Sequence, residues 1–185
     1  YRRAAEGGHQ AAARALASLY LTGNGVARDE QEGAHWLRTA ASSGNRAAQV
    51  DLANLVLQGA GEPDDITSVA GWFEAAALSG DLIAAFNLGL CFAKGVGVHQ
   101  DETRAAQWLR RAAEGVAEAQ YMYARILRDG RGVAADAQQA RAWFAQAAEG
   151  GMLDAQVALA EMLLNGSGGK RSPEAAIQLF RRAAA

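Results

Sequence analysis

One stretch decides how this 185-residue chain folds: Gly95-Val96-Gly97-Val98-His99-Gln100-Asp101-Glu102-Thr103-Arg104-Ala105-Ala106-Gln107-Trp108. It is typical of a tight turn with two glycines, followed by a helix that begins after an aspartate and carries a large aromatic residue. The same unit recurs along the whole chain. Its glycine pairs are 36, 36, 35 and 36 residues apart: Gly23/Gly25, Gly59/Gly61, Gly95/Gly97, Gly130/Gly132 and Gly166/Gly168. A period of this length predicts an array of stacked structural repeats.

Each repeat is predicted to hold two helices joined by the glycine turn, such as 45–58 and 66–77. Apolar or small residues recur at i, i+4, i+5 and i+8 of the first helix, which is the period of a helix and not of a strand. The second helix is expected to begin after a capping residue of the set Asp29, Asp65, Asp101, Asp136 and Ser172. A tryptophan seven residues further on (Trp36, Trp72, Trp108 and Trp143) is expected to pack in the core with the residue that follows it.

The repeat boundaries predicted from this pattern are 9–44, 45–80, 81–115, 116–150 and 151–185. Residues 1–8 match the end of a second helix, so they are expected to close a repeat that began upstream. Neither end carries the polar capping helix that repeat arrays need for solubility. We therefore expect 1–185 to be a single repeat array that forms part of a longer protein.

Composition narrows the function classes. The formal net charge of −2 argues against a protein that binds the phosphate backbone of nucleic acids. No apolar run approaches the roughly 18 residues of a membrane span, so no direct membrane insertion is expected. The three histidines fall at different positions of the repeat, and Cys91 falls at an apolar position, so we expect no metal site, no cofactor and no catalytic residue.

The fourth repeat closely resembles the Sel-one-like repeat family, relatives of the tetratricopeptide repeats. The residues that carry the resemblance are Ala119, Tyr123, Ala124, Leu127, Gly130-Arg131-Gly132-Val133, Asp136, Ala140, Trp143, Ala147 and Ala148. The resemblance implies an all-α, right-handed α/α superhelical solenoid of about five 36-residue helix-turn-helix repeats. It also implies a non-enzymatic adaptor for protein complexes, often in bacterial envelope assembly or signalling. A secreted branch of the family has paired cysteines in each repeat and is linked to penicillin binding; one cysteine does not match it. Bacterial periplasm and cytoplasm both stay open.

The resemblance also suggests where a partner binds, because first helices line the concave surface of tetratricopeptide-like solenoids. The first-helix positions opposite the core vary sharply from repeat to repeat, and several are apolar among polar neighbours, as at interaction surfaces. The predicted binding residues for a protein or peptide partner are Asp51, Asn54, Ile83, Asn87, Leu90, Lys94, Met122 and Arg125. The amides of Asn54 and Asn87 suit the backbone of an extended peptide.

Three alternatives remain at this point. One is a merely solvated face, because exposed positions vary without function. The second is a small-ligand or cell-wall-fragment site, or weak enzyme activity, in the same groove. The third is RNA binding by helical-pair repeats, which the acidic balance disfavours.

Overall fold

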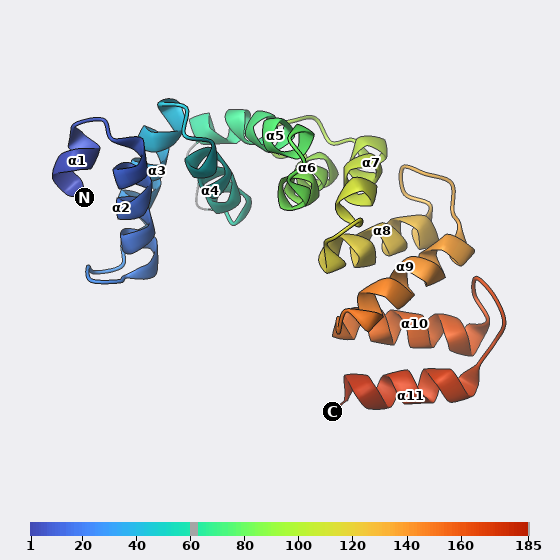
Figure 1. The fold of residues 1–185 in the computed structure, drawn as a ribbon. Helices are drawn as coiled ribbons and strands as arrows, with labels where there is room; N and C mark the ends of the chain where they lie inside the picture. The colour runs from blue at the N-terminus through green and yellow to red at the C-terminus, as the bar shows by residue number, and fades with distance from the viewer. Residues whose placement is uncertain (60–62, 185) are drawn as a thin grey trace. The chain divides into compact units, whose positions relative to one another are not determined.

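A computed structural model of the chain describes residues 1–59 and 63–184. This part of the chain is all-α, and its helices follow one another in sequential pairs (Figure 1). The helices are α1 (Arg2–Glu6), α2 (Gln10–Thr22), α3 (Glu30–Ser42), α4 (Arg46–Leu57), α5 (Pro63–Leu78), α6 (Leu82–Lys94), α7 (Glu102–Ala112), α8 (Ala117–Asp129), α9 (Ala137–Glu149), α10 (Leu153–Asn165) and α11 (Pro173–Ala183). The predicted helix 45–58 is confirmed as α4, and 66–77 lies inside the longer α5.

The helices belong to two compact units, and each is described by itself below. The first unit comprises Tyr1–Asn87 together with Gly95–His99. The second comprises Leu88–Lys94 together with the residues from Gln100 onward. Within each unit the two helices of a repeat pack on each other, as α2 does on α3 and α8 on α9.

The turns that end the first helices have the predicted geometry. Gly23, Gly95, Gly130 and Gly166 all adopt the left-handed conformation, with φ between 69° and 74°. Only a residue without a Cβ adopts it at no steric cost, which explains the repeated glycine. The capping aspartates are confirmed at three starts: the Asp29 carboxylate accepts from the amides of Gln31 and Glu32, Asp101 from Arg104, and Asp136 from Gln139. Ser172 precedes α11 but makes no such bond.

The second glycine of the turn is needed for a different reason, which is the close approach of another part of the backbone. A Cβ placed on Gly97 would lie 2.3 Å from the backbone oxygen of Ile66, at the start of α5. Gly132 and Gly168 make equally close approaches to the backbone of Glu102 and Ala137. The turn therefore docks against the beginning of the second helix of the preceding repeat. Gly61, the corresponding glycine of the second turn, lies outside the described residues.

Asp65 does not cap a helix, and that expectation is wrong. The helix begins earlier, at Pro63, so Asp65 lies inside α5. Its side chain is buried and forms a two-pronged ion pair with Arg38 of α3, with Nε–Oδ1 and Nη2–Oδ2 distances of 2.9 and 2.8 Å. Proline is favoured at the first helical position because its missing N–H has no partner there, which explains the early start.

In the second helices, the large side chains directly after the tryptophans are fully buried. Leu37, Phe73, Leu109 and Phe144, each directly after a tryptophan, are at most 1% exposed. Of the tryptophans, Trp36 is buried, whereas Trp72, Trp108 and Trp143 are only half-buried. Trp36 therefore belongs to the core, whereas the other three tryptophans cover it.

Candidate functional site

A hollow of about 600 Å³ lies between α2 and α4 in the first unit. Leu21, Leu37 and Leu55 give it an aliphatic floor, and the small side chains of α2 leave it open. Its lining also includes Asp51 and Asn54 of α4. Both belong to the predicted binding residues, so the first unit presents part of that set to a recess of ligand-binding size.

An ion pair crosses one side of this hollow. The Nε atom of Arg14 on α2 donates to Oδ2 of Asp51 on α4 over 2.6 Å. Both side chains keep more than a third of their exposure, so water screens the pair and its contribution to stability is small. The pair leaves the lining from the described part of the chain without net charge, since no other charged residue of that part lines the hollow.

A second hydrogen bond ties α4 to α6. The Nδ2 group of Asn87 donates to Oδ1 of Asn54 over 2.6 Å. Asn87 is only 8% exposed, whereas the predicted stripe was expected to face solvent. Substitution of Asn87 is therefore expected to affect stability as well as binding, because it leaves a polar partner unpaired.

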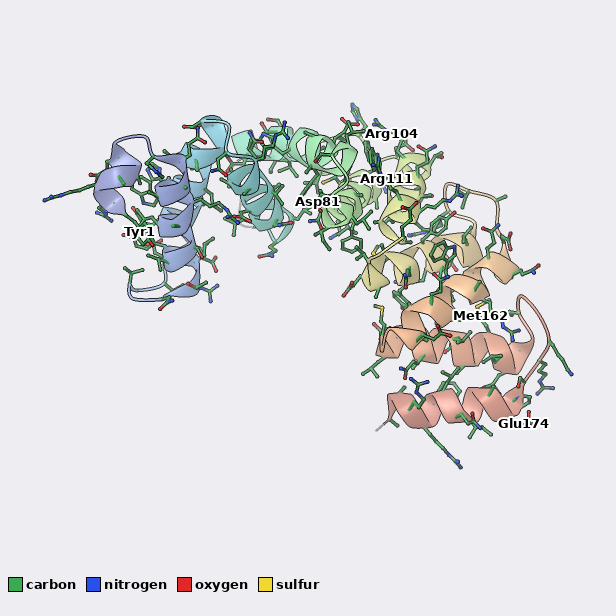
Figure 2. The ribbon with its side chains drawn as sticks, viewed as in Figure 1. Tyr1, Asp81, Arg104, Arg111, Met162 and Glu174 are labelled. Atoms are coloured by element: carbon green, nitrogen blue, oxygen red, sulfur yellow. The ribbon has the colours of Figure 1, made fainter. Side chains whose placement is uncertain are left out.

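A smaller hollow of about 300 Å³ lies on the other side of the ion pair and shares Arg14 and Asp51 with the first. Arg46, Val50 and Asp81 also line it. Asp81, labelled in Figure 2, precedes α6, and its carboxylate accepts from the amide of Ala84 over 3.0 Å. The Arg14–Asp51 pair thus borders two recesses within the first unit.

The eight predicted binding residues do not all line one hollow. Asp51 and Asn54 line the 600 Å³ hollow, and Ile83 is half-exposed in the first turn of α6 of the same unit. Leu90, Lys94, Met122 and Arg125 belong to the second unit. There the guanidinium of Arg125 lies 5.7 Å from the ring of Tyr121 on the same helix.

Sequence reasoning missed Arg14. It is 37 residues from Asp51, one more than the repeat period, so its partner does not stand at the equivalent position of the next repeat. Asn54 and Asn87 are 33 residues apart, three fewer than the period. An oppositely charged pair close to one period apart on adjacent first helices was the available signal.

The arginines of α7, the second helix of its repeat, lie on the surface of this helix. Arg104 and Arg111 project from this helix (Figure 2). Arg104 lies 4.0 Å over the ring of Phe92, and Arg111 lies 5.6 Å from the ring of Trp108. Arg110 is exposed, as expected for a solvated position.

The one cysteine has no feature of a nucleophile. Cys91 is fully buried, as its apolar position predicted, and burial raises the pKa of its thiol to about 11. Its thiolate is therefore scarce at neutral pH. Over residues 1–59 and 63–184, no three His, Cys, Asp or Glu side chains are grouped to hold a metal ion. Within the same ranges, no helix combines the length and hydropathy that crossing a bilayer requires.

Comparison with known proteins defines the class. The family model of the Sel1 repeat matches residues 10–45, 46–81, 82–115, 117–152 and 153–185. The protein therefore belongs to the Sel1 repeat family, and its five repeats of about 36 residues form the solenoid fold of that family. Sel1 repeats generally mediate protein interactions, and the fold is typically non-catalytic.

Solved structures agree with this assignment. The chain is similar to a protective antigen of uropathogenic Escherichia coli strains with an SLR fold, at 32% identity and a TM-score of 0.83 over 100% of this chain and 40% of that one. A Sel1 repeat protein from Oxalobacter formigenes shows 28% identity and a TM-score of 0.81 over 96% of this chain and 73% of that one. An immunity protein from Pseudomonas aeruginosa shares the fold alone, at 17% identity and a TM-score of 0.58 over 100% and 71% of the two chains. No curated protein matches the chain.

Proposed function

We propose that this protein is a non-enzymatic scaffold that binds a protein or peptide segment on its first-helix positions. In the first unit these are the outward positions of α2, α4 and α6 up to Asn87, and in the second unit those of the rest of α6, α8 and α10. The observation that carries the proposal is the 600 Å³ hollow between α2 and α4. It combines an aliphatic floor with a polar rim, the make-up of sites that bind ligands. Five repeats, with the predicted boundaries at 9, 45, 81, 116 and 151, supply these positions.

The proposed binding residues are those of the predicted stripe. In the first unit these are Asp51, Asn54, Ile83 and Asn87. In the second unit they are Leu90, Lys94, Met122 and Arg125. No observation favours an enzyme, because the titratable groups among the proposed binding residues are divided between the units, with Asp51 in the first and Lys94 and Arg125 in the second.

The footprint of a bound partner tests the proposal. The protein is cross-linked to its partner, and hydrogen exchange is compared with and without that partner. We expect protection on α2, α4, α6 and α8. Arg125→Ala is expected to weaken binding by about 1–3 kcal/mol, the cost of a polar group left unpaired in an interface. Arg110→Ala, at an exposed position of α7, is the control and should leave binding unchanged. A footprint on α7, α9 and α11 instead would overturn the proposal.

A further inference from the structure

The hollow between α2 and α4 has a rim of uncommitted amide groups. Oδ1 of Asn54 accepts from Asn87, which leaves the Nδ2 group of Asn54 free to donate into the hollow. Oδ1 of Asn45 caps α4 by accepting from the amide of Ala48, so its Nδ2 group is free as well. Gln58 lines the same hollow, and its side chain has no hydrogen-bond partner in the described part of the chain. Three N–H donor groups therefore face one recess.

An extended main chain matches this donor set. It presents one carbonyl oxygen per residue on alternating sides, and a primary amide donates to such an oxygen whatever the side chain. The carbonyl and N–H groups of a peptide need partners when they leave water, because an unpaired buried polar group costs free energy. Amide side chains meet that need without adding charge.

The lining also determines which side chains the segment can carry. Among residues 1–59 and 63–184, the charged residues of the lining are Arg14 and Asp51, and they neutralise each other over 2.6 Å. A charged side chain entering the hollow would lose hydration without a free counter-charge among these residues. The described lining also has no aromatic ring, so it offers no stacking surface for the flat apolar face of a sugar.

We infer that the hollow between α2 and α4 binds an extended polypeptide segment through its main chain and selects segments whose side chains are uncharged. This inference rests on the proposed function, since it names the place and the class of partner among the first-helix positions. It assigns a role to Arg14 and Asn45, which the repeat pattern did not single out, and to Gln58, which the pattern places with Asp51 and Asn54 opposite the core of the first helix.

A random heptapeptide library displayed on phage, selected on the purified 185-residue chain, tests the inference. We expect the enriched peptides to lack Asp, Glu, Lys and Arg at their central positions. Asn54→Leu keeps the branching of the side chain and removes its amide group, so it should weaken the binding of a synthetic enriched peptide about tenfold, the equivalent of one hydrogen bond. It also removes the acceptor of Asn87, so its stability is measured alongside binding. Ala15→Phe fills the hollow and should abolish binding. Arg110→Ala, at an exposed position of α7, is the control and should change nothing. Thermal unfolding followed by circular dichroism checks that each variant folds.

Peptide selection on two variants that change the charge of the hollow gives a test that does not depend on the Asn54 variant. Asp51→Asn leaves Arg14 without its partner, so the same library should then enrich acidic peptides, and Arg14→Gln should enrich basic ones. Charged peptides enriched on the unmodified chain, or peptides lost with Arg125→Ala but not with Asn54→Leu, would overturn the inference and leave the proposed function standing. If no peptide is enriched and the partner footprint lies on the second helices, both are wrong.

Discussion

The starts of α5 and α7 occupy the same place in consecutive repeats but are built differently. The α7 helix has 11 residues, and Asp101 precedes it and caps it by accepting from the amide of Arg104 over 2.9 Å. The α5 helix has 16 residues and begins before the equivalent aspartate, Asp65. Asp65 is thereby buried and paired with Arg38. Asp65 and Asp101 therefore stand at equivalent positions of their repeats but have different roles.

The cause of the difference is local. A cap must stand just outside the helix, where its oxygen reaches the free amides of the first turn. Because α5 begins at Pro63, Asp65 lies inside the helix, and its carboxylate accepts from Arg38 of the neighbouring helix α3. Arg38 provides both donors in the planar fork that suits a carboxylate. A shift of a few residues in the helix start thus converts a surface cap into a buried ion pair.

The largest expected effect tests what the two repeats share, which is the core position after the tryptophan. Phe73 and Leu109 are both fully buried. Phe73→Ala should lower the free energy of unfolding by about 4 kcal/mol and Leu109→Ala by about 3 kcal/mol, through lost burial and the cavity that remains. Urea denaturation measures both values. Trp108→Ala, at the half-buried position, is the control, and a loss larger than that of Leu109→Ala would mean that the tryptophans form the core after all.

The features that the sequence predicted depend on local geometry. Gly23, Gly95, Gly130 and Gly166 end helices because a left-handed residue is needed there, and Asp29, Asp101 and Asp136 cap the helices that follow. These roles need no knowledge of other repeats. The binding residues were harder to predict. Comparing equivalent positions from repeat to repeat assumes that contacts join the same position of neighbouring repeats, one period apart.

Contacts between repeats do not follow that assumption. Arg14 binds Asp51 over 37 residues, and Asn87 binds Asn54 over 33. Both bonds join different positions of neighbouring first helices, so the offset between packed helices decides them. Asp51 and Asn54 could be predicted from their repeat positions, whereas the role of Arg14 depends on how α2 lies against α4, and the bond of Asn87 on how α6 lies against α4.

The second prediction addresses the aspartates directly. Asp65→Ala leaves the Arg38 guanidinium without its carboxylate in a largely buried place, which should cost about 3 kcal/mol, the lower end of the range for a broken buried pair. Asp101→Ala removes one cap and should cost about 1 kcal/mol. A double-mutant cycle with Arg38→Ala isolates the coupling of the pair. Equal losses of stability for the two aspartate variants would contradict the different roles assigned to Asp65 and Asp101.

The third prediction concerns the turn that docks on the start of α5. Gly97 and Gly25 have similar backbone conformations, with φ of 69° and 76°. A Cβ on Gly97 would meet the backbone oxygen of Ile66 at 2.3 Å, whereas one on Gly25 would meet nothing within 4 Å. Gly25→Ala should therefore cost about 1 kcal/mol for the left-handed conformation alone. Gly97→Ala should cost about 1–3 kcal/mol more through the clash. Thermal unfolding measures the difference, and equal costs would contradict the docking of this turn.

The smallest effect gives the capped starts a pH dependence. In the fourth repeat, the amide of Gln139 donates to Asp136, and the Gln139 side chain adds a second bond of 2.7 Å; both hold the pKa of the Asp136 carboxyl below its usual range. A carboxyl whose pKa is lower in the folded than in the unfolded chain stabilises the fold above its unfolded pKa, about 3.9. That contribution disappears as the pH falls through the folded value. We therefore expect the Asp136 carboxyl carbon to titrate below pH 3.9 in an NMR experiment. Gln139→Ala removes only the side-chain bond, so it should raise this pKa part of the way. A carboxyl that titrates at its ordinary pKa, unmoved by Gln139→Ala, would show that no capping bond forms at α9 in solution. Asp29 and Asp101 would then be the remaining capping aspartates to set against the buried, ion-paired Asp65.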